Sequence, residues 1–471
     1  MPELTALGRD AGLAAGVLLL GTVAAWAISR QVGWRPAGPI ALFIAAPLVP
    51  NLDLLGPLST DDLLPILGLG ILATYVSRPV LTRDRLLRMG IAALGLAMLA
   101  RFATAIVHAN DVVGLLPALS VALLRPAFLI AVAVSVAMTV PAARRMRLVA
   151  AGLAILGTFE AIFTLVAYLV PTPGIGIRSL RQFENLAGCD YRITGTLGLS
   201  PNHIGAVFVV TIPFAIGLAI AAEGRRKWLW IAAASLQGTA LFMTFTRASI
   251  GLAVIGAIVL LAYHRQVRLF AAAAAMTALL VLGVTWFGCA PDQPATTSPP
   301  PASASPRSST PEQQAGPGSV LVDRLGDSTD RLALWYTAGL MTLDYPSFGV
   351  GIGNMVEVMR SNPDRYVDTP YGKSTNSAHN TVLLAGAETG VVGAVATLAL
   401  NLVLALIALR LLWSKGAVPP LSFAAGIAIL GFLAQGMVNN LFTVPATATL
   451  LALVVGAYAT SHVPDPPAAP T

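Results

Sequence analysis

The chain has 471 residues, of which 56% are hydrophobic and 11% are charged. A soluble protein of this length carries roughly a quarter of charged residues, so the composition excludes an ordinary soluble protein. Apolar runs of about 16 to 25 residues recur along nearly the whole sequence, and each can span about 30 Å of hydrocarbon as a helix. Because backbone groups in lipid must be hydrogen-bonded within their own segment, these runs predict an all-α polytopic membrane protein.

The net charge of +7 and the pI near 9.7 would also suit a nucleic-acid-binding protein. Most Arg and Lys residues, however, lie in short loops that alternate with positive-poor connections such as 51–62 and 108–111. The basic loops are residues 30–36, 78–88, 141–147, 223–228, 264–268 and 410–415. This alternation is the positive-inside pattern, so the charge indicates membrane topology and requires no nucleic acid.

Tracing the alternation predicts about 12 or 13 transmembrane helices. They lie near residues 11–29, 37–50, 63–77, 89–107, 112–140, 147–170, 202–222, 228–245, 248–263, 268–288, 381–409, 417–438 and 443–461. The first run is longer than a typical signal-peptide core and lacks a strongly basic leader, so we expect it to be retained. The predicted regions are membrane helices (1–170), an external loop (171–201), membrane helices (202–288), a large external loop (289–380), membrane helices (381–461) and a cytoplasmic tail (462–471).

The large external loop changes character along its length. Residues 291–319 are rich in Pro, Ser, Ala and Thr without hydrophobic periodicity, which predicts a disordered tether. Residues 330–345 have one apolar helical face, which predicts an amphipathic helix lying on, or packed onto, the membrane domain. That face consists of Leu332, Trp335, Tyr336, Leu340 and Leu343. Pro346 and the glycines of residues 348–354 should end the helix in a tight turn that lets the backbone approach the lipid surface. The glycines resemble a dinucleotide-binding motif, but no strand precedes them as such a site would require.

Cysteine and metal-ligand patterns exclude some chemistries. Cys189 and Cys289 fall one in each predicted external loop. They could form a disulfide or remain two unpaired thiols, and the sequence leaves both alternatives open. The sequence has no Cys/His cluster, no HExxH motif and no Gly-x-Ser-x-Gly motif. These absences disfavour zinc chemistry and serine hydrolysis, and no metal or cofactor is expected.

His379 is the strongest candidate catalytic residue. Histidine is the side chain best matched to proton transfer near neutral pH, and His379 lies where the chain re-enters the membrane. It is flanked by Asn376 and Asn380, so an interfacial helix cap is the alternative. His203 also lies at the outer mouth of a span, although capping by Asn202 explains its motif nearly as well.

External arginines form a second group of candidates, because the positive-inside bias works against them. They are Arg178, Arg181, Arg192, Arg247, Arg324 and Arg331. Arg247 lies in a short turn between two spans, close to the predicted bilayer surface, where a guanidinium can meet a phosphate with two parallel hydrogen bonds. Together Arg247 and Arg331 suggest a pyrophosphate clamp, with snorkelling to lipid headgroups as the alternative.

Charged residues inside the predicted spans must be paired, because an isolated charge at mid-bilayer is costly. Arg101, Arg125 and Glu160 each lie about 12 or 13 residues from a span end, which predicts an Arg–Glu cluster joining three helices. This cluster could be a structural ion pair or part of a transport site, and the sequence leaves both alternatives open. Glu388, in the span after His379, could neutralise an arginine or orient the histidine.

Four blocks of the sequence resemble the O-antigen ligase and O-antigen polymerase superfamily of bacterial membrane glycosyltransferases. They are TGTLGLSPNHIGAVFVVTIP (194–213), FTRASIG (245–251), DRLALWYTAGLMTLDYPSFGVGIGN (330–354) and SAHNTVLLAGAETGVVGAV (377–395). The resemblance covers most of residues 190–460. It implies a GT-C-type helical fold of about 12 spans with a large external loop over the active site.

The resemblance also implies a reaction. Family members take a glycan from an undecaprenyl-type pyrophosphate carrier and transfer it to an acceptor hydroxyl without metal or nucleotide sugar. Arg247 and Arg331 would hold the pyrophosphate, and His379 would activate or position the acceptor hydroxyl with inversion at the sugar carbon. Other substrate contacts would come from Arg178, Arg181, Arg192, Asn202, His203, Arg324, Asn376, Asn380 and Glu388. The implied place is the bacterial cytoplasmic membrane, with the site on the external face.

Other functions stay open on sequence grounds. The enzyme could be a ligase or a polymerase, since the acceptor, whether lipid, glycan or protein, is not visible in the residues. A glycan transporter or flippase would use Arg101, Arg125 and Glu160 as a pathway, although the sequence has no convincing inverted repeat or paired broken helices. A scaffold that docks partners on the Pro-rich loop is a third reading.

Overall fold

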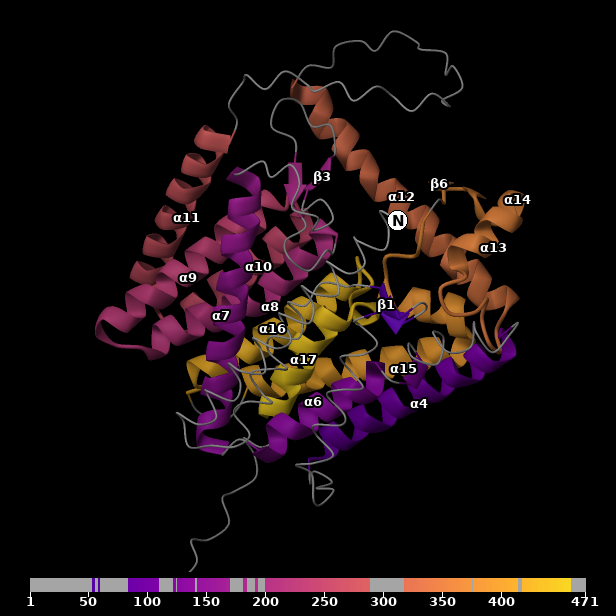
Figure 1. Cartoon of the computed structure of the whole chain (residues 1–471), viewed down its shortest axis with the longest axis horizontal. Helices are drawn as coiled ribbons and strands as arrows, with labels where there is room; N and C mark the ends of the chain where they lie inside the picture. The colour runs from indigo at the N-terminus through magenta and orange to yellow at the C-terminus, as the bar shows by residue number, and fades with distance from the viewer. Residues whose placement is uncertain are drawn as a thin grey trace, which may run out of the picture.

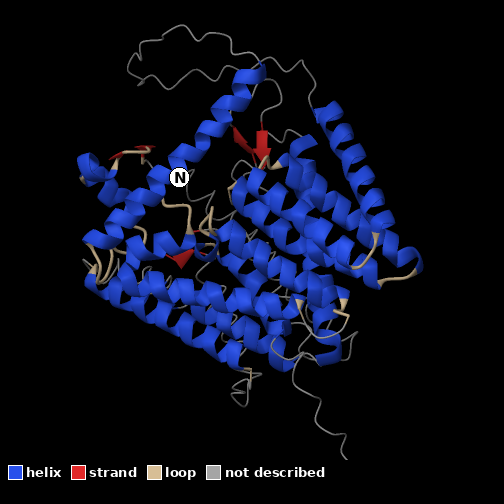
Figure 2. Ribbon diagram, turned by 180° about the vertical axis from the view of Figure 1, so that it is seen from behind, coloured by secondary structure: helices blue, strands red, loops and turns tan. Residues whose placement is uncertain are grey.

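The computed structural model describes residues 84–109, 122–123, 125–139, 142–169, 200–288, 317–374, 376–413 and 417–458, with the strands at 53–55, 58–59, 181–183 and 191–193. The predicted spans at 11–29, 37–50 and 63–77 lie outside these residues, as do Arg178, both cysteines and residues 291–316 of the predicted tether. The described chain is helical apart from short antiparallel strand pairs (Figure 2).

Four described helices are long and apolar enough to cross a membrane: α4 (Arg85–Val107), α7 (Ala142–Leu169), α8 (Pro201–Ala221) and α15 (Thr381–Leu412). The other helices of the bundle are α6 (Arg125–Thr139), α9 (Gly224–Met243), α10 (Arg247–Tyr263), α11 (Val267–Gly288), α16 (Pro420–Gly436) and α17 (Pro445–Tyr458). Each overlaps a span predicted from hydropathy. The fold is therefore that of an all-α polytopic membrane protein, as predicted.

Helix α8 is the centre of the bundle (Figure 1). Every residue from Ile204 to Ala219 is buried, because α7, α9, α10 and α16 surround it. Small residues allow this close packing: a Cβ added to Gly431 of α16 would lie 2.6 Å from Val209 of α8. Small residues at helix contacts are the usual solution in membranes, where packing rather than water exclusion drives helix association.

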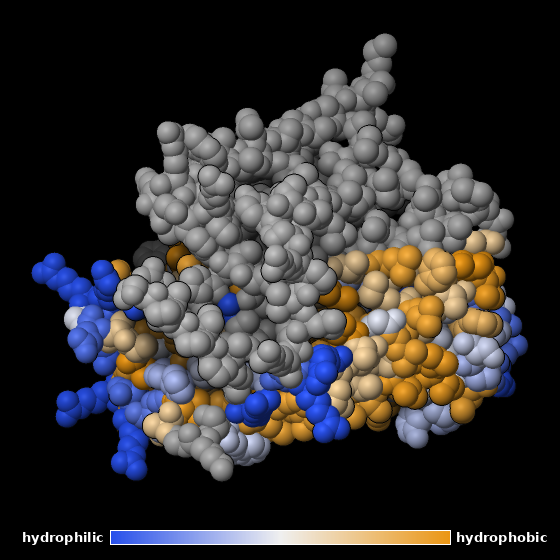
Figure 3. Space-filling view, turned by 90° about the horizontal axis from the view of Figure 1, so that it is seen from below, coloured by the Kyte–Doolittle hydropathy of each residue, from blue (hydrophilic) through white to orange (hydrophobic). Residues whose placement is uncertain are grey.

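Helices α4 and α15 pack along each other and form one flank of the bundle (Figure 1). Their outward side chains are large and apolar, with Leu99 62% and Leu402 57% exposed. Figure 3, which views the molecule from the side where α4 lies, shows a broad apolar area between hydrophilic patches. Such a surface is what lipid contact requires.

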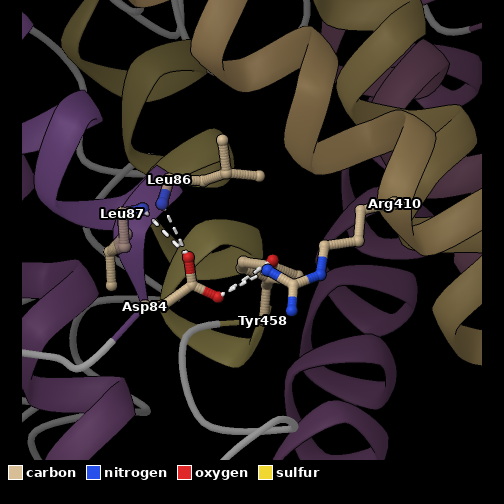
Figure 4. A network of polar contacts seen from close by, with 5 residues as sticks. All are labelled: Asp84, Leu86, Leu87, Arg410 and Tyr458. Atoms are coloured by element: carbon tan, nitrogen blue, oxygen red, sulfur yellow. Dashed lines mark hydrogen bonds and ion pairs between the residues drawn. The ribbon is translucent and has the colours of Figure 1, made fainter.

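A polar network ties α4, α15 and α17 together (Figure 4). The carboxylate of Asp84 accepts hydrogen bonds from the amides of Leu86 and Leu87, which caps α4. Its second oxygen forms an ion pair with Arg410 of α15 at 3.0 Å and accepts from the Tyr458 hydroxyl of α17 at 3.2 Å. We call these three residues the Asp84 network.

The segment predicted to be the large external loop contains α12 (Pro317–Asp344), α13 (Met355–Ser361), α14 (Pro363–Tyr366) and the pair β5 (Asp368–Thr369) and β6 (Gly372–Lys373). Two further pairs are β1 (Asp53–Leu55) with β2 (Leu58–Ser59), and β3 (Arg181–Phe183) with β4 (Tyr191–Ile193). Helix α12 begins at Pro317, so the last residues of the predicted tether are helical.

The prediction of which α12 face packs was wrong. The buried side chains between residues 331 and 341 are Ala333, Leu334, Thr337, Ala338 and Met341. The predicted stripe is largely outward, with Leu343 75% exposed. Helix α12 packs against α15, and the small alanines allow that approach, whereas the larger apolar side chains of the stripe do not fit it.

Candidate functional site

The segment before α15 holds His379 in an unusual conformation. His379 has a φ of 46°, which lies in the left-handed region that non-glycine residues disfavour. The next residue, Asn380, caps α15: its Oδ1 accepts from the amides of Val382 at 3.0 Å and Leu383 at 3.1 Å. The helix-cap role that we considered for His379 therefore belongs to Asn380, and the imidazole of His379 is half-buried beside it.

The first turns of α8 and α10 are in contact. The Thr246 hydroxyl, just before α10, donates to the carbonyl of Pro201 at 3.2 Å and lies 3.4 Å from Asn202 Oδ1. A Cβ added to Gly205 would lie 2.5 Å from the Ser249 hydroxyl, so this glycine allows the two helices to meet. The contact brings the α8 turn that carries His203 to the start of α10, where Arg247 is the first residue and is exposed.

His203 connects this contact to the α15 segment. Its Nδ1 is 3.0 Å from the Ser200 hydroxyl, and its ring interacts electrostatically with His379. The residue before α8 is Ser200, and Asn202 lies within the helix, so the predicted capping by Asn202 was wrong. His203, Arg247 and His379 thus lie at one end of the bundle, where α8, α10 and α15 begin. We call it the outer end, because the sequence predicts that it is external.

Residues 346–354, the glycine turn, fill a break in α15. Gly390 has φ 74° and ψ −170°, which interrupts the helix. The amides of Val350 and Gly351 donate to the carbonyls of Ala387 at 2.8 Å and Glu388 at 3.1 Å, next to the break. In return the Val391 amide donates to the Pro346 carbonyl at 2.9 Å. The turn therefore approaches protein backbone, whereas we had predicted that it approaches lipid.

Glu388 and α4 hold the glycine turn from two sides. The Glu388 carboxylate accepts from the Gly353 amide at 3.0 Å. On α4, the Thr104 hydroxyl donates to the Phe348 carbonyl at 3.0 Å, and His108 Nε2 lies 3.1 Å from the Gly349 carbonyl. The sequence had suggested no partner for His108. These contacts make Glu388, about two helical turns into α15, a residue that anchors the glycine turn.

Arg101 interacts electrostatically with Glu388 and with Arg125. The predicted cluster had joined Arg101 with Arg125 and Glu160. Arg125 is the first described residue of α6, and residues 122–123 before it are also helical. Glu388 thus interacts with an arginine, which is one of the two roles proposed for it, and its carboxylate also anchors the glycine turn.

The remaining predicted site residues are spread over the segments predicted to be external loops. Arg331 is half-buried on α12 and forms no hydrogen bond or ion pair with the described residues. Arg324 lies earlier on α12, and Arg181 and Arg192 lie on the paired strands β3 and β4. Asn376 is exposed and accepts from the Ser377 amide at 2.8 Å. No described contact brings these residues to His379.

A polar group that sequence reasoning missed lies between α12 and α14. Arg365 forms a two-pronged ion pair with Asp344, and the Tyr366 hydroxyl donates to the same carboxylate at 2.8 Å. The hydrogen bonds from Arg365 and Tyr366 lower the pKa of Asp344. Burial, with the bond to Asp344, raises the pKa of Tyr366 to about 12. The group fixes α14 to the end of α12; the Asp-Tyr-Pro and Asp-Arg-Tyr triplets alone do not predict their pairing.

Among the described residues, no three His, Cys, Asp or Glu side chains are grouped closely enough to hold a metal ion. Residues 232–398 match the family model described as O-Antigen ligase. The matched segment contains Arg247, Arg331, His379 and the glycine turn, but it excludes α8 and α16. No curated protein sequence matches the chain significantly. The match supports an O-antigen ligase/polymerase-type family and its membrane glycosyltransferase activity.

Proposed function

Because the family match supports an O-antigen ligase/polymerase-type membrane protein, we propose that this chain transfers a glycan from a polyprenyl pyrophosphate to an acceptor hydroxyl. The observation that supports it best is the convergence of His203, His379 and the α10 turn bearing Arg247 at the outer end of the bundle. A general base and a phosphate-binding cation, contributed by separate helices at one surface, are what this transfer requires.

Arg247 is suited to the pyrophosphate. It is the first residue of α10, where the amides of the first turn point outward and the helix dipole is positive. Thr246 makes no side-chain hydrogen bond to those amides, because its hydroxyl is directed to α8. The Arg247 guanidinium would bind the leaving pyrophosphate with two parallel hydrogen bonds and stabilise the charge that develops on it. Arg331 would act on the same group from α12 after the donor binds.

His379 would act as the general base. The acceptor oxygen attacks the anomeric carbon, the bond from that carbon to the pyrophosphate oxygen breaks, and the lipid pyrophosphate leaves with the electron pair. The imidazole accepts the proton of the acceptor hydroxyl. Because attack and departure occur on opposite faces of the sugar, the product has inverted configuration. No step in this scheme needs a metal ion.

Several finer points of this proposal come from the sequence. The protein would lie in the bacterial cytoplasmic membrane with about 12 or 13 spans and its site on the external face. Arg178, Arg181, Arg192, Arg324 and Asn376 would contact the substrate from the external loops. Asn202 would assist from α8. We assign no substrate contact to Asn380 and Glu388, because their polar atoms form hydrogen bonds within the protein.

A transfer assay with purified protein tests the proposal. The donor is a polyprenyl-pyrophosphate glycan, and candidate acceptors are a lipid, a glycan and a protein. We expect His379→Ala and Arg247→Ala each to lower kcat by about 10²-fold or more, as loss of a base or of an anion-binding group does elsewhere. Arg360→Ala, which removes an exposed arginine of α13, should leave kcat unchanged.

Two outcomes would contradict the proposal. If both variants transfer glycan at the wild-type rate, neither residue has the assigned role. If a chelator abolishes transfer, the metal-free scheme is wrong. Reconstituted vesicles separate the transporter reading: movement of the lipid-linked glycan that depends on Arg101 and Glu160, without transfer, would favour it. The single break in α15 gives that reading little support, because the glycine turn fills it.

A further inference from the structure

The turn that follows α16, residues 436–440, lies against the segment that carries His379. After the histidine, Asn380 Nδ2 donates to the Met437 carbonyl at 3.1 Å. The Thr381 hydroxyl proton is shared between the carbonyls of residues 436 and 439, at 3.0 and 3.2 Å. The 436–440 turn therefore fixes the chain on the α15 side of His379.

Asn440 fixes the chain on the other side. Its Nδ2 donates to the Ser377 hydroxyl at 3.0 Å, two residues before the histidine. Asn440 is only 9% exposed, and its own carbonyl accepts from the Thr443 amide at 3.2 Å and the Thr443 hydroxyl at 2.6 Å. Its Oδ1 is buried without a hydrogen-bond partner among the described residues. Among the described residues, the bond to Ser377 is thus the one hydrogen bond of this side chain.

The residue between these two attachments is the strained one. A left-handed conformation at a non-glycine residue persists only where the surrounding structure holds it. At His379 the hydrogen bonds of Ser377, Asn380 and Thr381 hold the chain on both sides of the strained residue. Strain of this kind is a known way to direct a side chain into an active site.

We propose that the 436–440 turn is a clamp that positions His379, and that Asn440 is a positioning residue acting through Ser377. The inference rests on the proposed role of His379 as the general base. The family match ends at residue 398, so it assigns nothing to this turn. The clamp comes from a different helix pair, α16 and α17, and so links the orientation of the base to the packing of the C-terminal helices.

Transfer kinetics of Asn440→Ala and Ser377→Ala test the clamp. A misplacement of about 1 Å at a reacting group can lower the rate about 10²-fold, so we expect kcat to fall by about 10- to 100-fold in each variant. KM should stay within about twofold, because neither residue is assigned a substrate contact. Since both variants remove the same bond, the double variant should be no worse than either single one.

Asn362→Ala is the matched control. Asn362 Nδ2 donates to the Ser361 hydroxyl at 3.1 Å, which is the same kind of bond in an exposed external segment. Its removal should leave kcat unchanged. A thermal unfolding curve of each variant excludes global misfolding, and Ser377→Ala, the smaller change, keeps the test decisive if Asn440→Ala does not fold.

The His379→Ala background separates this inference from the proposed function. If His379→Ala keeps a measurable residual rate and adding Asn440→Ala lowers that rate further, Asn440 acts elsewhere and the clamp is refuted. If His379→Ala is fully active, the proposed function fails, and the rate of chemical modification of His379 is then the remaining test of the clamp. Carbethoxylation of His379 by diethyl pyrocarbonate should become about twofold faster or more in Asn440→Ala, as the segment loosens, and not in Asn362→Ala. Equal labelling rates would overturn the clamp.

Discussion

Adding a methyl group to Gly349 should separate the glycine turn from α15. Gly349 has a φ of +65°, and a Cβ built there would overlap the backbone of Glu388 and Thr389. The left-handed conformation costs a non-glycine residue about 1–2 kcal/mol. If the turn moves away, the amides of Val350 and Gly351 lose their acceptors, and each unsatisfied buried group costs about 1–3 kcal/mol.

The expected loss of stability for Gly349→Ala is therefore about 3–8 kcal/mol, a large part of the roughly 5–15 kcal/mol of a folded domain. Gly353→Ala is the matched control: Gly353 has φ +79°, but no atom lies within 4 Å of an added Cβ. It should lose only the conformational part, about 1–2 kcal/mol. Thermal unfolding of both variants in the same detergent measures the difference. Similar Tm values would show that the turn does not depend on this close approach.

Two further predictions concern stability. Asp84→Ala removes the α4 cap, worth about 1 kcal/mol, and both bonds of the Asp84 network. Arg410→Ala removes only a partly exposed ion pair, worth about 0.2–1 kcal/mol. Asp84→Ala should therefore lower Tm more than Arg410→Ala does, and the reverse order would contradict the network. The depressed pKa of Asp344 stabilises the fold above the unfolded value of about 3.9 and ceases to do so as pH falls through the lower folded value. Asp344→Asn should thus lower Tm modestly at pH 7, because the pair is partly exposed, and the Tm difference should shrink as pH falls below about 3.9; a pH-independent difference would argue against the ion pair.

Hydropathy and charge alternation predicted the helices well. The starts of α8, α10 and α15 lie within about one residue of the predicted spans, because apolar length and flanking charge are local properties of the sequence. The same local signals identified Arg247 and His379, since polar residues at span ends stand out in an apolar chain. Their roles stay predictions until the transfer assay is done.

The residues with which each polar or packed residue interacts were predicted less well. The sequence shows that Glu388 must be neutralised in the membrane, but Arg101, its partner, is 287 positions away. It also shows two asparagines around His379 without showing that Asn380 is a cap. For α12, amphipathicity predicted a packed face but selected the larger side chains, whereas contact with α15 required the smaller ones.

The amino-acid sequence by itself determined that this is an all-α membrane protein, where most of its helices lie and which residues carry unusual chemistry. Those properties follow from the cost of placing polar groups in lipid, which each segment must meet alone. Tertiary structure decided the rest: the glycine turn in the α15 break, the Arg101–Glu388 interaction and the hold of Asn440 on the His379 segment. Each of these depends on hydrogen bonds or charges from segments far apart in the chain, and no local pattern encodes which distant group will supply them.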